Sequence, residues 1–293
     1  MALVREIREE AEKKGSSVLL FDCGDVNTGE PGSDMLMAEP DIKAMNLMGY
    51  HAMAVGNHEF DLPMEKLLKQ QSWASFPYLA ANVFYTKDDS HVFKPMVMFG
   101  IKGLKIAVFG ITTPKTPSIS TCGNNKDIRF ANPREIIPQI LEELKGKADL
   151  IIGLFHHDHE EVVALAKEFP GIDIILGGHT HLPTPSPIQV GKTLVVEAGS
   201  YGMMVGRLDL SFEGTRMVQS RYELIGLNLS QPLMDNDGKI TCHPYAKKYE
   251  PDPEMKAFLK PYLDRTAKLL DEEIGETKED RKSTRLNSSH VSQ

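Results

Sequence analysis

The sequence predicts a layered α/β domain. Short apolar runs of strand length alternate with helical stretches, and several of these runs end in glycine or polar residues typical of turns. The 293 residues are 41% hydrophobic and 25% charged, an ordinary globular composition with enough length to bury a core. We therefore expect a folded chain without internal repeats rather than a disordered one.

The first half of the chain sets up the alternation. Residues 2–14 have a helical apolar face and stop at Gly15, and residues 17–23 (SVLLFDC) are typical of a buried strand. A helix over residues 40–48 closes at Gly49, and Asp61 is expected to cap a helix that begins near Pro63. Further strands are predicted at residues 51–55, 78–82, 93–99 and 104–111.

The second half continues it and then changes character. Asn132 and Pro133 open a helix that runs to residue 145, and a hairpin with Glu213 and Gly214 at its tip is predicted between residues 193 and 224. Asp252, followed by proline, caps a long helix reaching about residue 273. Between these lie predicted strands at residues 150–155 and 172–176, separated by a helix over residues 160–168.

Charge and cysteine usage exclude several classes of protein. Lys and Arg number 33 against 41 Asp and Glu, and the resulting net charge of −8 disfavours docking onto nucleic acid or an anionic membrane. No apolar run approaches the roughly 18 residues of a membrane span, and no signal-peptide pattern is visible. Cys23, Cys122 and Cys242 are too far apart for a zinc pair; one disulfide is compatible with them, and the sequence does not choose it.

Residues of metal-ligand type follow four of the predicted strands. Asp25 and Asn57 come after the first two strands of the chain, His156 follows residues 150–155, and His179 and His181 follow residues 172–176. Each alone has a bland explanation as a turn or a solvated helix start, although two imidazoles one residue apart in extended backbone point the same way. Because ligands gather outside the carboxyl ends of strands in open α/β sheets, we expect one shared site.

The residue types indicate the chemistry of that site. Carboxylate, amide oxygen and imidazole without thiolate suit manganese, zinc, iron or magnesium, and an aspartate can bridge two ions. Two ions about 3.5–4 Å apart activate a water and clamp the oxygens of a displacement at phosphorus. A histidine that is not a ligand, such as His58, stabilises charge or protonates the leaving oxygen, and Asp61 orients its ring. The pattern predicts phosphate-ester hydrolysis.

These motifs resemble the 5′-nucleotidase family of the calcineurin-like metallophosphatase superfamily. GNHEFD and GGHTH carry the resemblance together with residues 38–63, GDVNTG, LKIAVFGITT and EIGET, over about residues 1–280. The resemblance implies an α-β-β-α sandwich, here missing its first strand and followed by a long interdomain helix. It also implies two divalent ions (Mn, Zn, Mg, Fe or Co), a nucleotide or nucleotide-sugar substrate and a periplasmic or secreted location.

By position, the resemblance assigns roles to particular residues. Asp25 matches the bridging carboxylate, His58 and Asp61 match the catalytic pair, and Glu59 receives no catalytic task. His156 is preferred over His157 as a ligand because it directly follows the apolar strand. The full set of expected metal ligands is Asp25, Asn57, His156, His179 and His181, with His181 serving the first ion and His179 completing the second.

The departures from the family pattern shape the expected domains. Members of the family begin with a strand ending in Asp-x-His, and nothing equivalent precedes Asp25, so we expect one ion to be held well and the other poorly. We expect a catalytic domain over residues 1–226, a connector over 227–251 and a linker helix over 252–275. Residues 276–293 are expected to be a stub and a foreign tail, with the carboxy-terminal nucleotide-binding domain absent.

Three functions stay open at this point. The first is a nucleotide-hydrolysing phosphoesterase of the 5′-nucleotidase or UDP-sugar hydrolase type, and the second is a 2′,3′-cyclic nucleotide phosphodiesterase. The third is an inactive fragment that binds a single ion. The sequence does not choose the metal, the nucleotide or the oligomeric state.

Overall fold

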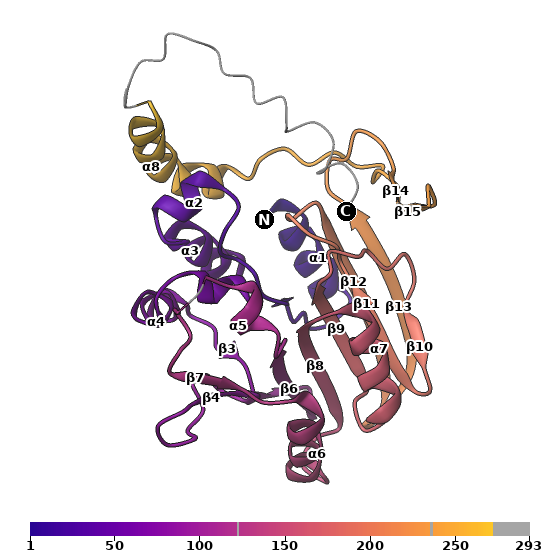
Figure 1. The fold of residues 1–293 in the computed structure, drawn as a ribbon. Helices are drawn as coiled ribbons and strands as arrows, with labels where there is room; N and C mark the ends of the chain where they lie inside the picture. Colours follow the sequence, from indigo (N-terminus) through magenta and orange to yellow (C-terminus); the bar gives the residue numbers. More distant parts are fainter. Residues whose placement is uncertain (122, 235–236, 272–293) are drawn as a thin grey trace.

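The computed structural model describes residues 1–121, 123–234 and 237–271, and Figure 1 shows their arrangement. Its elements, in chain order, are α1 (Ala2–Lys13), β1 (Phe21–Asp22), α2 (Pro31–Met35), α3 (Glu39–Met48), β2 (Ala52–Ala54), η1 (His58–Asp61), α4 (Met64–Trp73), β3 (Tyr78–Leu79), β4 (Val83–Tyr85), β5 (Met96–Ile101), β6 (Leu104–Thr112), α5 (Thr116–Ile119), β7 (Ile128–Phe130), α6 (Pro133–Leu144), β8 (Leu150–His157), α7 (His159–Glu168), β9 (Ile174–His179), β10 (Ile188–Val190), β11 (Thr193–Glu197), β12 (Met204–Glu213), β13 (Arg216–Gly226), β14 (Leu233–Met234), β15 (Ile240–Cys242) and α8 (Pro253–Leu270).

Two sheets form the centre of the molecule. The larger has six strands in the order β10-β11-β9-β8-β6-β5, and the smaller has three in the order β1-β2-β3. Strands β6, β8, β9 and β11 run parallel to one another, whereas β5 and β10 pair antiparallel at the two edges. All strands of the smaller sheet are parallel. The carboxyl ends of the inner strands therefore lie at one edge of each sheet.

The two sheets pack face to face, and helices cover their outer faces, which gives four layers. Along β6 the side chains alternate: Val108 belongs to the buried cluster that also contains Leu79 of the smaller sheet, and Phe109 belongs to the cluster that also contains Leu165 of α7. Helices α3 and α4 cover the outer face of the smaller sheet through a cluster that includes Ile42, Met45, Leu67 and Tyr78. The predicted α-β-β-α sandwich is confirmed.

Two local predictions differ from the structure. Helix α4 begins at Met64 without a side-chain cap, so the expected capping role of Asp61 is wrong. The N-cap position of α4 falls on Pro63, two residues after Asp61, and the carboxylate of Asp61 bonds the ring of His58 instead. The strand expected over residues 17–23 is reduced to Phe21–Asp22.

The end of the described chain agrees with its sequence signals. The Asp252 carboxylate accepts hydrogen bonds from the backbone N–H groups of Glu254 (3.0 Å) and Met255 (3.2 Å) and caps α8. Residues 272–293, including the EIGET motif and the expected tail, lie outside the described part. Cys23 and Cys242 are free cysteines, while Cys122 is among the residues left undescribed.

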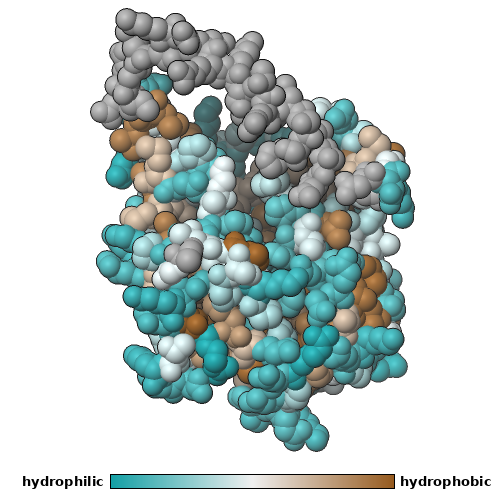
Figure 2. Space-filling view, in the orientation of Figure 1, coloured by the Kyte–Doolittle hydropathy of each residue, from teal (hydrophilic) through white to brown (hydrophobic). Residues whose placement is uncertain are grey.

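In Figure 2 hydrophilic residues cover most of the visible face, and hydrophobic residues appear in small separate groups. Within residues 1–121, 123–234 and 237–271, no helix has both the length and the apolar character needed to cross a membrane.

Candidate metal centre

The predicted ligands gather where neighbouring strands end. Asp25 lies just after β1, and Asn57 follows β2, which pairs with β1 in parallel. His156 and His179 belong to the adjacent parallel strands β8 and β9, where His156 lies opposite Gly178. The two sheets thus deliver their polar ends to one place, as the parallel arrangement predicts.

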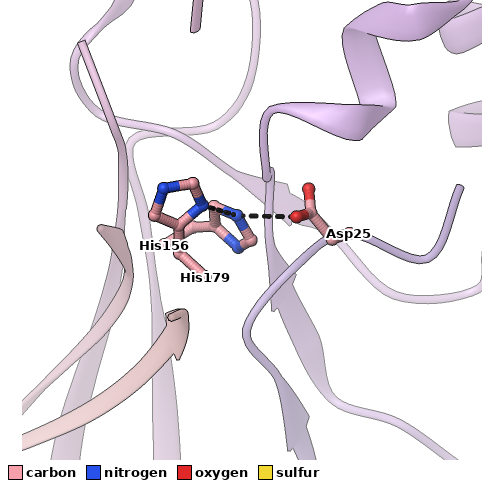
Figure 3. Close-up of side chains that lie close together, drawn as sticks. All are labelled: Asp25, His156 and His179. Atoms are coloured by element: carbon pink, nitrogen blue, oxygen red, sulfur yellow. Dashed lines mark hydrogen bonds and ion pairs between the residues drawn. The ribbon is translucent and has the colours of Figure 1, made fainter. Parts of the chain in front are cut away.

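The imidazole of His156 is the centre of this cluster. Its Nε2 lies 3.0 Å from Asp25 Oδ2 and 3.1 Å from both His179 Nδ1 and Asn57 Oδ1. Figure 3 shows both imidazoles facing the Asp25 carboxylate, and the ligand atoms of Asp25, His156 and His179 all lie within 4.8 Å of one another. Among the described residues this is the one group of at least three His, Cys, Asp or Glu that could hold a metal ion.

Burial and a backbone bond fix the orientation of His156. The residue is 1% exposed, and its Nδ1 lies 2.7 Å from the carbonyl oxygen of Cys23. Because a carbonyl oxygen only accepts hydrogen bonds, Nδ1 carries a proton, and Nε2 is the ring nitrogen that faces the cluster. This is the second hydrogen bond that orients most metal-binding histidines.

Close approach of the backbone requires glycine at position 56. A Cβ atom there would lie 2.2 Å from Asp25 Oδ1 and 2.8 Å from His156 Cε1. Any side chain at this position would therefore displace two of the predicted ligands.

The charge states favour metal-ligand chemistry. Burial, followed by the nearby charge of His156, lowers the pKa of His179 to about 4, so its ring is neutral at pH 7. Burial acts to raise the pKa of Asp25, but its hydrogen bond and charge interaction with His156 outweigh burial and lower it. A charged carboxylate and a neutral imidazole are the forms that bind divalent ions.

His58 and Asp61 form a pair beside the cluster. His58 Nδ1 lies 2.5 Å from Asp61 Oδ2, and the backbone N–H of His58 donates to Asp25 Oδ1 at 2.8 Å. Thr28 Oγ1 and the Thr121 backbone N–H each donate to Asp61 at 2.9 Å. Burial lowers the pKa of His58, but the bond to Asp61 and the charges of Asp25 and Asp61 raise it overall.

His181 is placed differently from the other predicted ligands. Its ring meets that of Tyr201 edge to face, with 5.3 Å between centroids, and it is not in the group of three. The expectation of an extended backbone here is wrong, because φ is 83° at His179 and 60° at His181. The two rings therefore do not share the period-two alignment of a strand, and the assignment of His181 to an ion stays a prediction.

Several other residues around the cluster were not expected from the sequence. His179 Nε2 lies 3.8 Å from Asp158 Oδ1, and Lys115 Nζ lies 2.8 Å from Asp158 Oδ2. Asp158 stands in the His-rich run after β8, which is a sequence signal, whereas nothing distinguishes Lys115 from other surface lysines. His157 accepts a hydrogen bond from the Asp158 backbone N–H (2.8 Å) and stays outside the group, so His156 is the histidine of this strand that joins it.

A buried carboxylate also joins the two histidine-bearing strand ends. Glu197, 2% exposed at the end of β11, lies 2.6 Å from His159 Nδ1 and accepts from Thr180 Oγ1 at 3.2 Å. Glu197 lies outside the sequence motifs, so the sequence did not predict this role.

Comparison with known proteins identifies the family. Residues 1–183 match the family model described as calcineurin-like phosphoesterase. The chain belongs to this family. The resemblance predicted from GNHEFD and GGHTH is thereby confirmed.

Two named relatives align with nearly the whole chain. Protein UshA of Yersinia enterocolitica is 36% identical over 93% of the chain and 55% of its own length. The 5′-nucleotidase of Vibrio vulnificus is 35% identical over 94% of the chain and 55% of its own length. The chain thus spans little more than half of these relatives.

A solved structure gives the same picture. The 5′-nucleotidase precursor from Thermus thermophilus superposes with a TM-score of 0.73 at 25% identity and covers 92% of this chain and 53% of that one. The superposition supports the metallophosphatase fold of this chain.

Proposed function

We propose that this protein is a metal-dependent phosphoric ester hydrolase of the 5′-nucleotidase type. The observation that carries the proposal is the convergence of Asp25, Asn57 and His179 on His156 Nε2, next to the His58–Asp61 pair. Membership in the phosphoesterase family supports the same reaction class.

The donor set fits a divalent ion. Asp25, Asn57, His156 and His179 would hold it with a carboxylate oxygen, an amide oxygen and two imidazole nitrogens, which suits Mn, Zn, Fe, Co or Mg. When bound, the ion supplies positive charge that lowers the pKa of a water and offsets charge at phosphorus. Because the described residues offer one such group, we propose that each chain holds one ion tightly. A second ion, with Asp25 and His181 as its ligands from the described residues, would be held poorly.

The residues beside the ion handle the proton and the developing charge. His58 donates through Nδ1 to Asp61, which leaves Nε2 to stabilise the phosphoryl oxygens or to protonate the leaving oxygen as the P–O bond breaks. Thr28 and Thr121 hold the Asp61 carboxylate, so the ring of His58 keeps one orientation. Orientation of a general acid in this way is a common source of rate enhancement.

Nucleotides are the substrates we propose. Relatives named 5′-nucleotidase are 35% identical over most of the chain, which supports a nucleoside phosphate ester ahead of other phosphate esters. Nucleotide sugars and a periplasmic or secreted location, both expected from the family resemblance, belong to the same proposal. Hydrolysis assays on a series of nucleotides would identify the preferred substrate.

Hydrolysis assays test this function. We expect the purified chain with Mn²⁺ to release phosphate from an aryl phosphate and from 5′-nucleotides, and His58→Ala to lower kcat by about 10²–10⁴-fold. The exposed His243 provides the control, because His243→Ala leaves the site intact. Equal, metal-independent background in the wild type and His58→Ala would instead establish an inactive fragment, and preference for 2′,3′-cyclic nucleotides would assign the other phosphodiesterase reaction.

A further inference from the structure

The carboxylate of Glu59 joins two loops of the candidate metal centre. Its Oε2 accepts hydrogen bonds from the backbone N–H groups of Gly56 (2.7 Å) and Asp25 (2.9 Å). Its Oε1 accepts from those of Val26 (2.8 Å) and Asn27 (3.2 Å). One side chain thus collects four amides, three from the loop after β1 and one from the loop after β2.

The buried position of the Glu59 carboxylate requires compensation of its charge. Glu59 is 1% exposed, and a buried carboxylate costs several kcal/mol unless hydrogen bonds or a cation compensate it. Among the described residues no Lys, Arg or His forms an ion pair with Glu59, so backbone amides supply its direct compensation. The side chain therefore specifies loop geometry rather than surface charge.

The loop that Glu59 holds is strained at Asp25, one of the proposed metal ligands. Asp25 has a φ of 64°, in the left-handed region that costs a non-glycine residue about 1–2 kcal/mol. Its backbone N–H is held by Glu59, and its Oδ1 is held by the backbone N–H of His58. Both ends of Asp25 are thereby tied to the segment that contains Asn57.

We propose that Glu59 is a positioning residue of the metal centre, which fixes Asp25 and Asn57 at the spacing that a divalent ion requires. This inference rests on the proposed function, because it assumes that these residues bind a metal. Glu59 acts through the backbone and touches neither the ion nor the substrate.

The isosteric change Glu59→Gln isolates the four hydrogen bonds. Glutamine keeps the shape but replaces one oxygen with an NH₂ group, which points a donor at two backbone donors. We expect the affinity for Co²⁺ to fall about 10–100-fold, as for other residues that orient metal ligands, and the visible Co²⁺ spectrum to change because the coordination geometry changes.

Two controls separate positioning from general damage. Asp173→Asn is the same kind of acid-to-amide change near the amino end of β9, where Asp173 accepts from the Ile151 backbone N–H at 2.9 Å. Leu144→Ala removes a side chain that is 3% exposed in α6, and it costs about 2–5 kcal/mol of stability away from the site. Both controls should keep the wild-type Co²⁺ affinity and spectrum.

The outcomes distinguish this proposal from the function on which it rests. Weaker Co²⁺ binding with an altered spectrum in folded Glu59→Gln supports it, and wild-type binding in that variant overturns it alone. Failure of the wild type to bind Co²⁺ overturns the proposed function and this inference together. If Glu59→Gln does not fold, amide exchange in the wild type decides: core-like protection of the Asp25, Val26 and Asn27 amides supports the proposal, and rapid exchange overturns it.

Discussion

Removal of His179 is the most informative single perturbation of the proposed metal centre. Its side chain is 18% exposed, and its Nδ1 lies 3.1 Å from His156 Nε2. His179→Ala therefore deletes one of four ligands at the rim of the cluster without opening a deep cavity. We expect the metal-free variant to stay within about 1 kcal/mol of the wild type in unfolding free energy.

The expected loss of metal affinity follows from the number of ligands. Four-ligand zinc sites bind with about 10–16 kcal/mol, so one ligand is worth about 3 kcal/mol, or about 100-fold in the dissociation constant. At a metal concentration about 100 times the wild-type dissociation constant, binding stabilises the wild type by about 2.7 kcal/mol and the variant by about 0.4 kcal/mol. For a chain of this size the wild-type gain raises Tm by about 5–11 °C.

Thermal unfolding with and without Zn²⁺ measures this difference. His157→Ala is the matched control, because His157 is the adjacent buried histidine of β8 and lies outside the group of three. The control should keep the metal-induced rise in Tm that His179→Ala loses. The reasoning is refuted if His179→Ala shows the same metal-induced rise as the wild type.

Two further predictions test the surroundings of the site. Gly56→Ala places a Cβ 2.2 Å from Asp25 Oδ1, so we expect this variant to lose about 1–3 kcal/mol of stability and to bind Zn²⁺ more weakly in a titration. Gly100→Ala is the control, because no atom lies within 4 Å of its Cβ, and it should change neither quantity. Equal effects in the two variants would contradict the packing argument. The hydrogen bonds to Arg207 and then Lys14 lower the pKa of Glu10 from 4.5 to about 2, so its contribution to stability is present above pH 4.5 and is lost as the pH falls to about 2. Over this pH window, the unfolding free energy measured with urea should depend less on pH in Glu10→Gln than in the wild type. An unchanged pH dependence would contradict the stabilising role of the bonds from Arg207 and Lys14 to Glu10.

The strands and the site residues near them were predictable because their signals are local. Runs such as residues 150–155 are apolar on both faces, which the structure explains by burial between a second sheet and helix α7. His156 directly follows such a run, so its place at the strand end could be inferred from its position alone. The places of Asp25 and Asn57 after the first two strands could be inferred in the same way.

The rest depends on contacts between residues far apart in the chain. Glu59 and Glu197 are buried acids whose partners are set by the packing of separate loops, and their sequence context contains no period or spacing that names those partners. Backbone conformation was also out of reach, because residues such as Asp25 and His181 adopt positive φ without being glycine. The capping role expected of Asp61 is wrong because the structure places Pro63 at the N-cap and pairs Asp61 with His58, three residues before it.

A crystal structure of the full chain grown with Zn²⁺, with anomalous diffraction recorded at the zinc edge, tests the central claim most directly. We predict one strong anomalous peak about 2.0–2.2 Å from ligand atoms of Asp25, His156 and His179. A peak elsewhere, or none beside these three side chains, would contradict the assignment of the metal centre.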